Sequence, residues 1–191
     1  MEDIRPLDIR QESIIDSFPV INCKKEVLNV GCGLGSMDYF IVKHGYKVYS
    51  TDYEEKKTWG KYEGVTFYKS NIFDLSSFPV ESCDIVICSE VLEHLHEYKV
   101  AANNLIKLSN VRVILTVPFE KSYNSNKPVP VGHCNWWNDF GTNGYKDIRE
   151  FEELAKPYAT SIQKIRTKPK DVSMNQMDYL IIIDKKQRYN V

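Results

Sequence analysis

Within one short stretch, VLNVGCGLGSMDYF (27–40), an apolar run is followed by three glycines at every second position, 31, 33 and 35. The run EVLNV (26–30) has the composition of a buried strand, and a helix is expected from about Ser36 to His44. Glycine lets the backbone turn sharply between the two and lets a ligand approach the chain closely. The stretch therefore predicts a strand–turn–helix unit with a candidate binding site at the turn. A tight turn without a ligand would have the same sequence pattern.

The rest of the chain alternates between the strand and helix patterns. Strands followed by helices over short connections predict parallel βαβ units. Near the C-terminus, nine residues separate two strand patterns, which is too short for a parallel crossover, so these strands should be antiparallel if they are neighbours. Further strands are predicted at 46–52, 65–71, 83–89, 111–117, 160–167 and 177–184, and helices at 90–109 and 147–158.

Composition limits the classes to which this chain can belong. With 191 residues, of which 42% are hydrophobic, one domain over residues 23–191 is expected, preceded by an arm at 1–22 with one helix from about Ile4 to Phe18. The formal net charge of −1 argues against a partner such as DNA or long RNA. No apolar run reaches the ~20 residues of a membrane helix, and no signal peptide is seen. Five cysteines without a C-x-x-C pair indicate reduced thiols and a cytoplasmic protein.

The position of Asp52 after the glycines is a second signal in the sequence. Asp52 ends the second predicted strand, about 20 residues after the glycine turn. A carboxylate there can accept hydrogen bonds from both hydroxyls of a ribose. By itself such a residue would be read as a solvated loop charge, and only the combination with the glycines favours ribose binding.

Four motifs in this order resemble the class I S-adenosylmethionine-dependent methyltransferases. They are VLNVGCGLG, the strand-end Asp52, NIFDLSSFP and CDIVICSEVLEHL, and they span about residues 26–120. The resemblance implies an α/β, Rossmann-like, mostly parallel seven-stranded sheet with the last strand antiparallel and helices on both faces. It also implies S-adenosyl-L-methionine as cofactor and methyltransferase activity.

The resemblance assigns cofactor contacts residue by residue. The glycine turn would face the amino-acid part of the cofactor, and Asp52 would hold the ribose. Asn71 stands where the family usually has Asp at the adenine amino group, and its carbonyl oxygen can still accept. The implied cofactor-binding residues are Gly31, Cys32, Gly33 and Gly35 in the turn, Asp52 and Tyr53 for ribose and adenine, Asn71 and Ile72 for the adenine, and Ser89 and Glu90 near the methionine end.

A long segment, 118–147, has neither helix nor strand periodicity, and loops of this length are usually functional or disordered. It is rich in aromatic residues, which suit a wall against a sugar, nucleoside or aromatic ring but could equally cover the edge of the sheet. His133 is a candidate general base, or else a surface histidine. The candidate acceptor-binding residues are Phe119, Tyr123, Trp136 and Trp137.

A second interpretation uses two carboxylates and two imidazoles. Glu90, Glu93 and His94 would share one face of the predicted helix, and with His133 they could hold a divalent cation. This arrangement is similar to small-RNA 3′-terminal 2′-O-methyltransferases. We expect no metal, because EVLEHL also occurs in metal-free family members and the chain lacks a basic RNA tract. His96 is expected to face solvent.

The sequence therefore predicts a methyltransferase that acts on a small hydroxylated or amino-bearing molecule, such as a sugar, with His133, Glu93 and His94 as candidate catalytic residues. A metal-assisted RNA ribose methyltransferase and a catalytically silent methyltransferase-like binding protein are the alternatives. A nicotinamide oxidoreductase is disfavoured by the G-x-G-x-G spacing. The sequence leaves open the acceptor, the oligomeric state and whether residues 1–22 form a lid.

Overall fold

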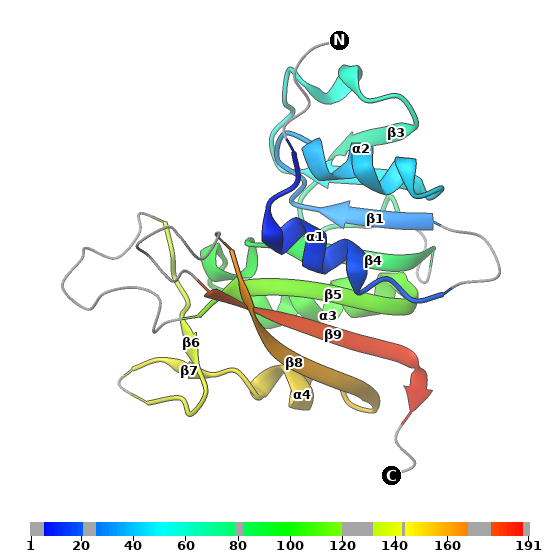
Figure 1. The fold of residues 1–191 in the computed structure, drawn as a ribbon. Helices are drawn as coiled ribbons and strands as arrows, with labels where there is room; N and C mark the ends of the chain where they lie inside the picture. The colour runs from blue at the N-terminus through cyan, green and yellow to red at the C-terminus, as the bar shows by residue number, and fades with distance from the viewer. Residues whose placement is uncertain are drawn as a thin grey trace.

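The computed structural model describes residues 6–20, 26–78, 82–119, 132–142, 144–167 and 177–188, the last range with side chains to residue 185. A seven-stranded sheet runs through the molecule, and two short strands form a separate ribbon (Figure 1). The strands are β1 (Glu26–Val30), β2 (Lys47–Asp52), β3 (Val65–Lys69), β4 (Cys83–Ser89), β5 (Ser109–Pro118), β6 (Trp137–Asn138), β7 (Lys146–Asp147), β8 (Tyr158–Arg166) and β9 (Met177–Arg188). The helices are α1 (Ile9–Asp16), α2 (Ser36–Lys43), α3 (Tyr98–Leu108) and α4 (Glu150–Leu154), with 3-10 turns η1 (Trp59–Lys61) and η2 (Leu92–His94).

The strand order in the sheet is β3-β2-β1-β4-β5-β9-β8. The first five strands are parallel, and β9 is antiparallel to both of its neighbours, β5 and β8. The prediction of a mostly parallel seven-stranded sheet with its last strand reversed is confirmed. Because β9 runs in the opposite direction, its first residues lie at the edge where β4 and β5 end.

Side chains alternate between two apolar layers, as expected for strands buried on both faces. Val86 and Cys88 of β4 join one cluster together with α3 and α4, whereas Ile85 and Ile87 join the other together with α1 and α2. Helix α1 thus packs on the sheet with α2, and Ile14 is fully buried there (Figure 1).

The predicted helix at 90–109 is wrong in its first half. The segment forms the short turn η2, Leu95 is extended, and α3 begins only at Tyr98. The carbonyl of Glu93 accepts the N–H groups of Cys134 and Asn135 at 2.6 and 3.0 Å, so distant backbone takes the place of the next helical turn.

Two of the other three helix predictions were too long, whereas the helix expected at Ser36–His44 agrees with α2. The arm helix covers Ile9–Asp16, where Asp8 caps it by accepting from the Gln11 N–H, and the helix predicted at 147–158 is reduced to α4. In the described part of the chain, no helix is long and apolar enough to cross a membrane.

Candidate active site

The three glycines of the turn after β1 all have a positive φ, between 55° and 78°. A Cβ on Gly31 would lie 2.3 Å from Cγ2 of Val91, and one on Gly35 would lie 2.7 Å from Cζ of Phe67, whereas a Cβ on Gly33 would meet nothing within 4 Å. Val91 and Phe67 thus require glycine at positions 31 and 35, whereas the space beside Gly33 is open. Gly31 also borders the cavity at this turn, so the contacts of the glycines with a ligand stay a prediction.

The turn is held by the strand and loop beside it. Asp52 Oδ2 accepts the N–H of Gly33 at 2.9 Å, and the Trp59 indole N–H donates to the Gly33 carbonyl at 3.0 Å. Trp59 is itself stacked on Phe67, with ring centroids 5.1 Å apart. Sequence reasoning did not single out Trp59, and a tryptophan shortly after the strand-end acid is the signal that could have found it.

A cavity of about 510 Å³ opens at the carboxyl edge of the sheet, next to this turn. Seven of the predicted site residues line it: Gly31, Asp52, Tyr53, Asn71, Ile72, Glu90 and His94. The remaining predicted cofactor contacts, Cys32, Gly33, Gly35 and Ser89, lie outside this lining. The cavity thus joins the ends of β1, β2 and β4.

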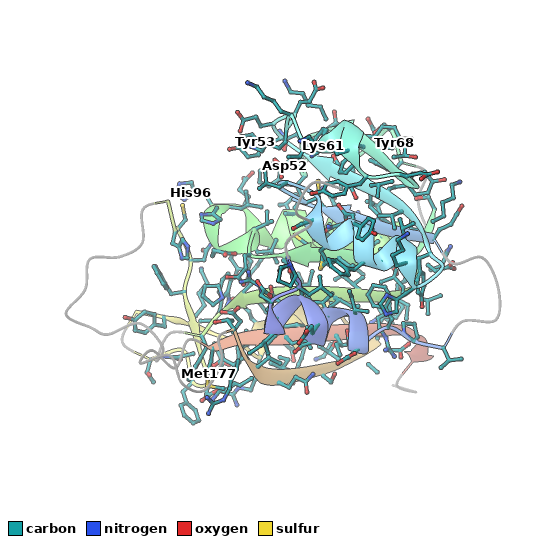
Figure 2. The ribbon with its side chains drawn as sticks, turned by 45° about the horizontal axis from the view of Figure 1, so that its top comes forward. Asp52, Tyr53, Lys61, Tyr68, His96 and Met177 are labelled. Atoms are coloured by element: carbon teal, nitrogen blue, oxygen red, sulfur yellow. The ribbon has the colours of Figure 1, made fainter. Side chains whose placement is uncertain are left out.

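Asp52 and Tyr53 differ in exposure although they are neighbours at the end of β2 (Figure 2). The Asp52 residue is buried, whereas Tyr53 is 76% exposed, and Lys56 Nζ lies 5.8 Å from the centroid of its ring. Across the cavity, Asn71 Oδ1 accepts the Phe73 N–H at 3.0 Å, and an amide oxygen keeps a second lone pair for another donor.

Glu90 follows β4 directly and has a φ of 56°, a left-handed conformation that costs a non-glycine residue about 1–2 kcal/mol. Its Oε1 accepts from the Thr116 hydroxyl at 3.1 Å, and its Oε2 pairs with Arg10 at 3.1 Å. Ser89 Oγ lies 2.8 Å from the same Thr116 hydroxyl. Glu90 is therefore directed towards β5 and the arm.

Glu93, His94 and His133 come together on the other side of Glu90. One ligand atom from each lies within 4.8 Å of the others. His94 Nδ1 is 3.0 Å from the Gly132 carbonyl, which can only accept, so Nδ1 carries the proton and Nε2 is left basic. That Nε2 lies 3.8 Å from Glu93 Oε1. The predicted shared helical face is wrong, because the turn η2 replaces the helix, and Glu90 is outside this trio.

The surroundings of Glu93 and His133 shift the pKa values of both side chains. Burial, and secondarily the charge of Glu90, raises the pKa of Glu93 to about 9. Burial also lowers the pKa of His133, helped by His94, whose ring is perpendicular to it at 4.6 Å. Among the described residues, Glu93 Oε2 and His133 Nδ1 are buried atoms without a hydrogen-bond partner. The trio therefore has unused capacity to hold a proton or a cation.

The candidate acceptor residues separate into three groups. Trp136 is half-buried against His133, with ring centroids 4.8 Å apart. Phe119 and Trp137 are buried in the core, where Trp137 donates to Glu150 at 2.6 Å, so neither is free to form a pocket wall. Tyr123 lies outside the described residues, as do the other residues of 120–131 in the loop that was expected to choose the acceptor.

His96 is exposed, as expected, and lies near the segment that leads into β6 (Figure 2). Its Nε2 is 3.6 Å from the Cys134 sulfur. The described cysteines, Cys32, Cys83, Cys88 and Cys134, are all free.

The comparison with known proteins concerns the part of the chain that holds these residues. Residues 28–109, from β1 to the end of α3, match the methyltransferase domain family. This part of the chain is therefore similar to a methyltransferase domain. The predicted family resemblance is thus confirmed over the part that holds the glycine turn, Asp52, Asn71 and Glu90.

A curated relative is the ubiquinone biosynthesis O-methyltransferase of Rickettsia felis. It is 33% identical over an alignment of 104 residues, and the match covers 49% of this chain and 42% of the relative. This chain thus spans less than half the length of the relative.

Solved structures share the fold at low identity. An S-adenosylmethionine-dependent methyltransferase from Mesorhizobium loti has a TM-score of 0.66 at 12% identity, covering 91% of this chain and 96% of that one. Magnesium protoporphyrin IX methyltransferase from Synechocystis, with S-adenosylhomocysteine bound, has a TM-score of 0.64 at 17% identity, covering 91% and 83%. The Burkholderia thailandensis 1,6-didemethyltoxoflavin-N1-methyltransferase has a TM-score of 0.62 at 14% identity, covering 84% and 71%.

Proposed function

We propose that this protein transfers the methyl group of S-adenosylmethionine to a small hydroxylated or amino-bearing molecule. The observation that carries the proposal is the cavity of about 510 Å³, which brings Gly31, Asp52, Asn71 and His94 to one edge of the sheet. In this arrangement Asp52 would accept from the ribose hydroxyls, Asn71 and Ile72 would contact the adenine, and the methionine end would lie towards Glu90. Where parallel strands end is also where ligands of open α/β sheets bind.

Methyl transfer requires the protein mainly to align the acceptor with the methyl group and to remove a proton. The methyl group on a sulfonium is already activated, so the site must orient the acceptor, exclude water and take its proton. His94 fits the role of the base, because it lines the cavity and the Gly132 carbonyl engages its Nδ1 rather than its Nε2. Glu93 Oε1 lies 3.8 Å from this Nε2, and even a protonated Glu93 has a carbonyl oxygen that can accept a hydrogen bond from the imidazolium that results. His133 is the second candidate.

Three observations bear on the class of acceptor. The name of the Rickettsia felis relative supports an oxygen acceptor, and the half-buried Trp136 beside His133 supports a planar or sugar ring against it. The formal net charge of −1 disfavours an acceptor within long nucleic acid.

Replacing Asp52 with alanine tests the cofactor site. The unaltered protein should bind S-adenosylhomocysteine in calorimetry and show no comparable binding of NAD. Asp52→Ala should weaken S-adenosylhomocysteine by about 1–3 kcal/mol, because the ribose hydroxyls lose their acceptor. Glu54→Ala is the matched control, since it removes an exposed carboxylate two residues away that pairs with Lys56. Equal affinities of the two variants would remove Asp52 from the site, and binding without turnover would favour the catalytically silent alternative.

A metal-assisted mechanism is the second candidate, because the structure brings Glu93, His94 and His133 within 4.8 Å of one another. A carboxylate suits Mg²⁺ or Mn²⁺, and the two imidazoles favour a transition metal such as Mn²⁺ over Mg²⁺. An ion there would polarise an acceptor hydroxyl, such as the 2′-hydroxyl of an RNA end. Arg10 already neutralises Glu90, so the fourth predicted ligand is not directed at this group.

Chelation separates the two mechanisms. If a histidine acts as a metal-free base, replacing it with alanine should lower turnover by about 10²–10⁴-fold, and EDTA should have no effect. If the trio holds a cation, EDTA should abolish activity and Mn²⁺ should restore it. Direct Mn²⁺ binding, followed by electron paramagnetic resonance in the unaltered protein and in Glu93→Gln, gives a readout that needs no substrate. We expect chelator resistance, and Mn²⁺ bound through Glu93 would contradict it.

A further inference from the structure

Arg10 of the arm helix α1 reaches the wall of the cofactor cavity. Its Nη1 lies 3.1 Å from Glu90 Oε2 and 3.2 Å from Asp178 Oδ2, and its Nη2 lies 3.5 Å from Asp8. Asp178 sits near the start of β9, which the reversal of that strand brings to the edge of the sheet next to Glu90. One guanidinium thus bridges the arm, the end of β4 and the start of β9.

Glu90 is a residue whose orientation needs external support. It lines the cavity and holds a left-handed backbone conformation that most side chains avoid. Thr116 fixes one of its carboxylate oxygens and Arg10 fixes the other. Its surroundings are also acidic, because Glu93 and Asp178 are both buried nearby. Without Arg10, the Glu90 carboxylate would lose its paired cation and turn away from this arrangement.

We infer that Arg10 is a positioning residue of the methyl-transfer site: it fixes Glu90 at the cavity wall and so makes helix α1 a working part of that site. The inference rests on the proposed function, since it takes S-adenosylmethionine as the ligand of the cavity. Binding in the cavity and docking of α1 are then linked, and each must strengthen the other to the same extent.

A second arginine provides a matched control. Arg112 also ties the arm to the sheet, through the Ser17 carbonyl at 2.6 Å, and pairs with Asp184 at 2.6 Å. It lies outside the cavity lining and makes no contact with Glu90 in the described structure. Helix α1 is further anchored by the buried Ile14 and Ile15, so neither arginine alone should be needed for the helix to dock.

Affinity for S-adenosylhomocysteine, measured by calorimetry, tests the positioning role. Arg10→Ala should weaken binding about 10-fold or more, Arg10→Lys should recover part of that loss, and Arg112→Ala should bind like the unaltered protein. Hydrogen exchange of the α1 amides should slow when S-adenosylhomocysteine is added to the unaltered protein and to Arg112→Ala, but not in Arg10→Ala. Equal affinities of the Arg10→Ala and Arg112→Ala variants would overturn the inference.

A ligand-free measurement keeps this test separate from the proposed function. In urea unfolding, the stability changes of Arg10→Ala and Glu90→Gln should be non-additive, whereas those of Arg112→Ala and Glu90→Gln should add. Additive effects in the first pair would show that Arg10 does not hold Glu90 and would overturn the inference even if the cofactor binds. Failure of the unaltered protein to bind S-adenosylhomocysteine would instead overturn the proposed function, and the positioning role with it.

Discussion

Trp59 connects two segments of the cofactor site that are 26 residues apart in the sequence. Its indole donates to the Gly33 carbonyl, while its ring stacks on Phe67, whose own edge occupies the space beside Gly35. The glycine turn is therefore shaped by aromatic residues as much as by the glycines. Its backbone N–H groups are pre-arranged before any ligand enters.

Replacing Trp59 with phenylalanine removes the N–H donor and keeps most of the aromatic stack. We expect S-adenosylhomocysteine affinity to fall about 2- to 10-fold, because one neutral hydrogen bond contributes about 0.5–1.5 kcal/mol. The melting temperature should change little. Titration calorimetry and thermal unfolding of this variant, with Trp136→Phe as control, check the expectation. A large loss of stability without a change in affinity would show that Trp59 only fills the core.

The segment that leads into β6 shows how two adjacent tryptophans take different roles. Strand geometry points successive side chains to opposite sides, so Trp137 enters the core beside Tyr98 and Phe151 while Trp136 turns to His133. The same segment donates to the carbonyl of Glu93 and, through the Asn135 amide, to that of Leu92. It thereby both interrupts the predicted helix and supports the imidazole pair.

Alanine substitutions should separate these roles. Trp137→Ala should lower the free energy of unfolding by about 3–5 kcal/mol, because a fully buried ring and its bond to Glu150 are lost. Trp136→Ala should cost much less stability and leave cofactor affinity nearly intact, while turnover of the acceptor falls. Urea unfolding and calorimetry of both variants provide the comparison. Equal destabilisation by the two would place Trp136 in the core as well.

Over the whole molecule, several buried carboxyl groups should make the ligand-free protein more stable at acidic than at alkaline pH. Burial raises the pKa of Asp38 to about 7, although Asn29 donates to it at 2.7 Å. Burial, and then the charge of Glu90, raises the pKa of Asp178 to about 7 and that of Glu93 to about 9. These groups bind protons more tightly in the folded than in the unfolded state. Their contribution to stability is therefore complete below pH ~4 and is lost as pH rises through 7 to 9.

We expect the free energy of unfolding to fall by at least about 2 kcal/mol between pH 5.5 and pH 8.5. His133 acts in the opposite direction, because its lowered pKa favours the folded state as pH rises, but it is one group against three. Urea unfolding at several pH values measures the slope. Asp38→Asn should flatten it, since an amide keeps the acceptor for Asn29 and has no charge to bury. A slope of zero or the opposite sign would contradict the expectation.

Local patterns in the sequence were sufficient to predict most of the sheet. The strands at 26–30 and 83–89, the reversed β9 and the placement of Asp52 at a strand end follow from side-chain periodicity and from the length of one connection. These features depend on residues close together in the chain and on the few ways in which short connections can join strands. The family resemblance then linked the same motifs to a cofactor.

The remaining features of the fold and of the candidate site depend on contacts between segments that are distant in the chain. Val91 explains why residue 31 must be glycine, Trp59 holds the turn, and Arg10 reaches Glu90 at the carboxyl edge of the sheet. The helical spacing in 90–109 could not reveal that residues 134 and 135 would take the carbonyl of Glu93. The sequence by itself determined which residues could bind, because side-chain chemistry and local spacing depend only on the order of the residues. Only the tertiary structure decided which of them meet, because burial and hydrogen bonding are settled between segments that lie far apart in the chain.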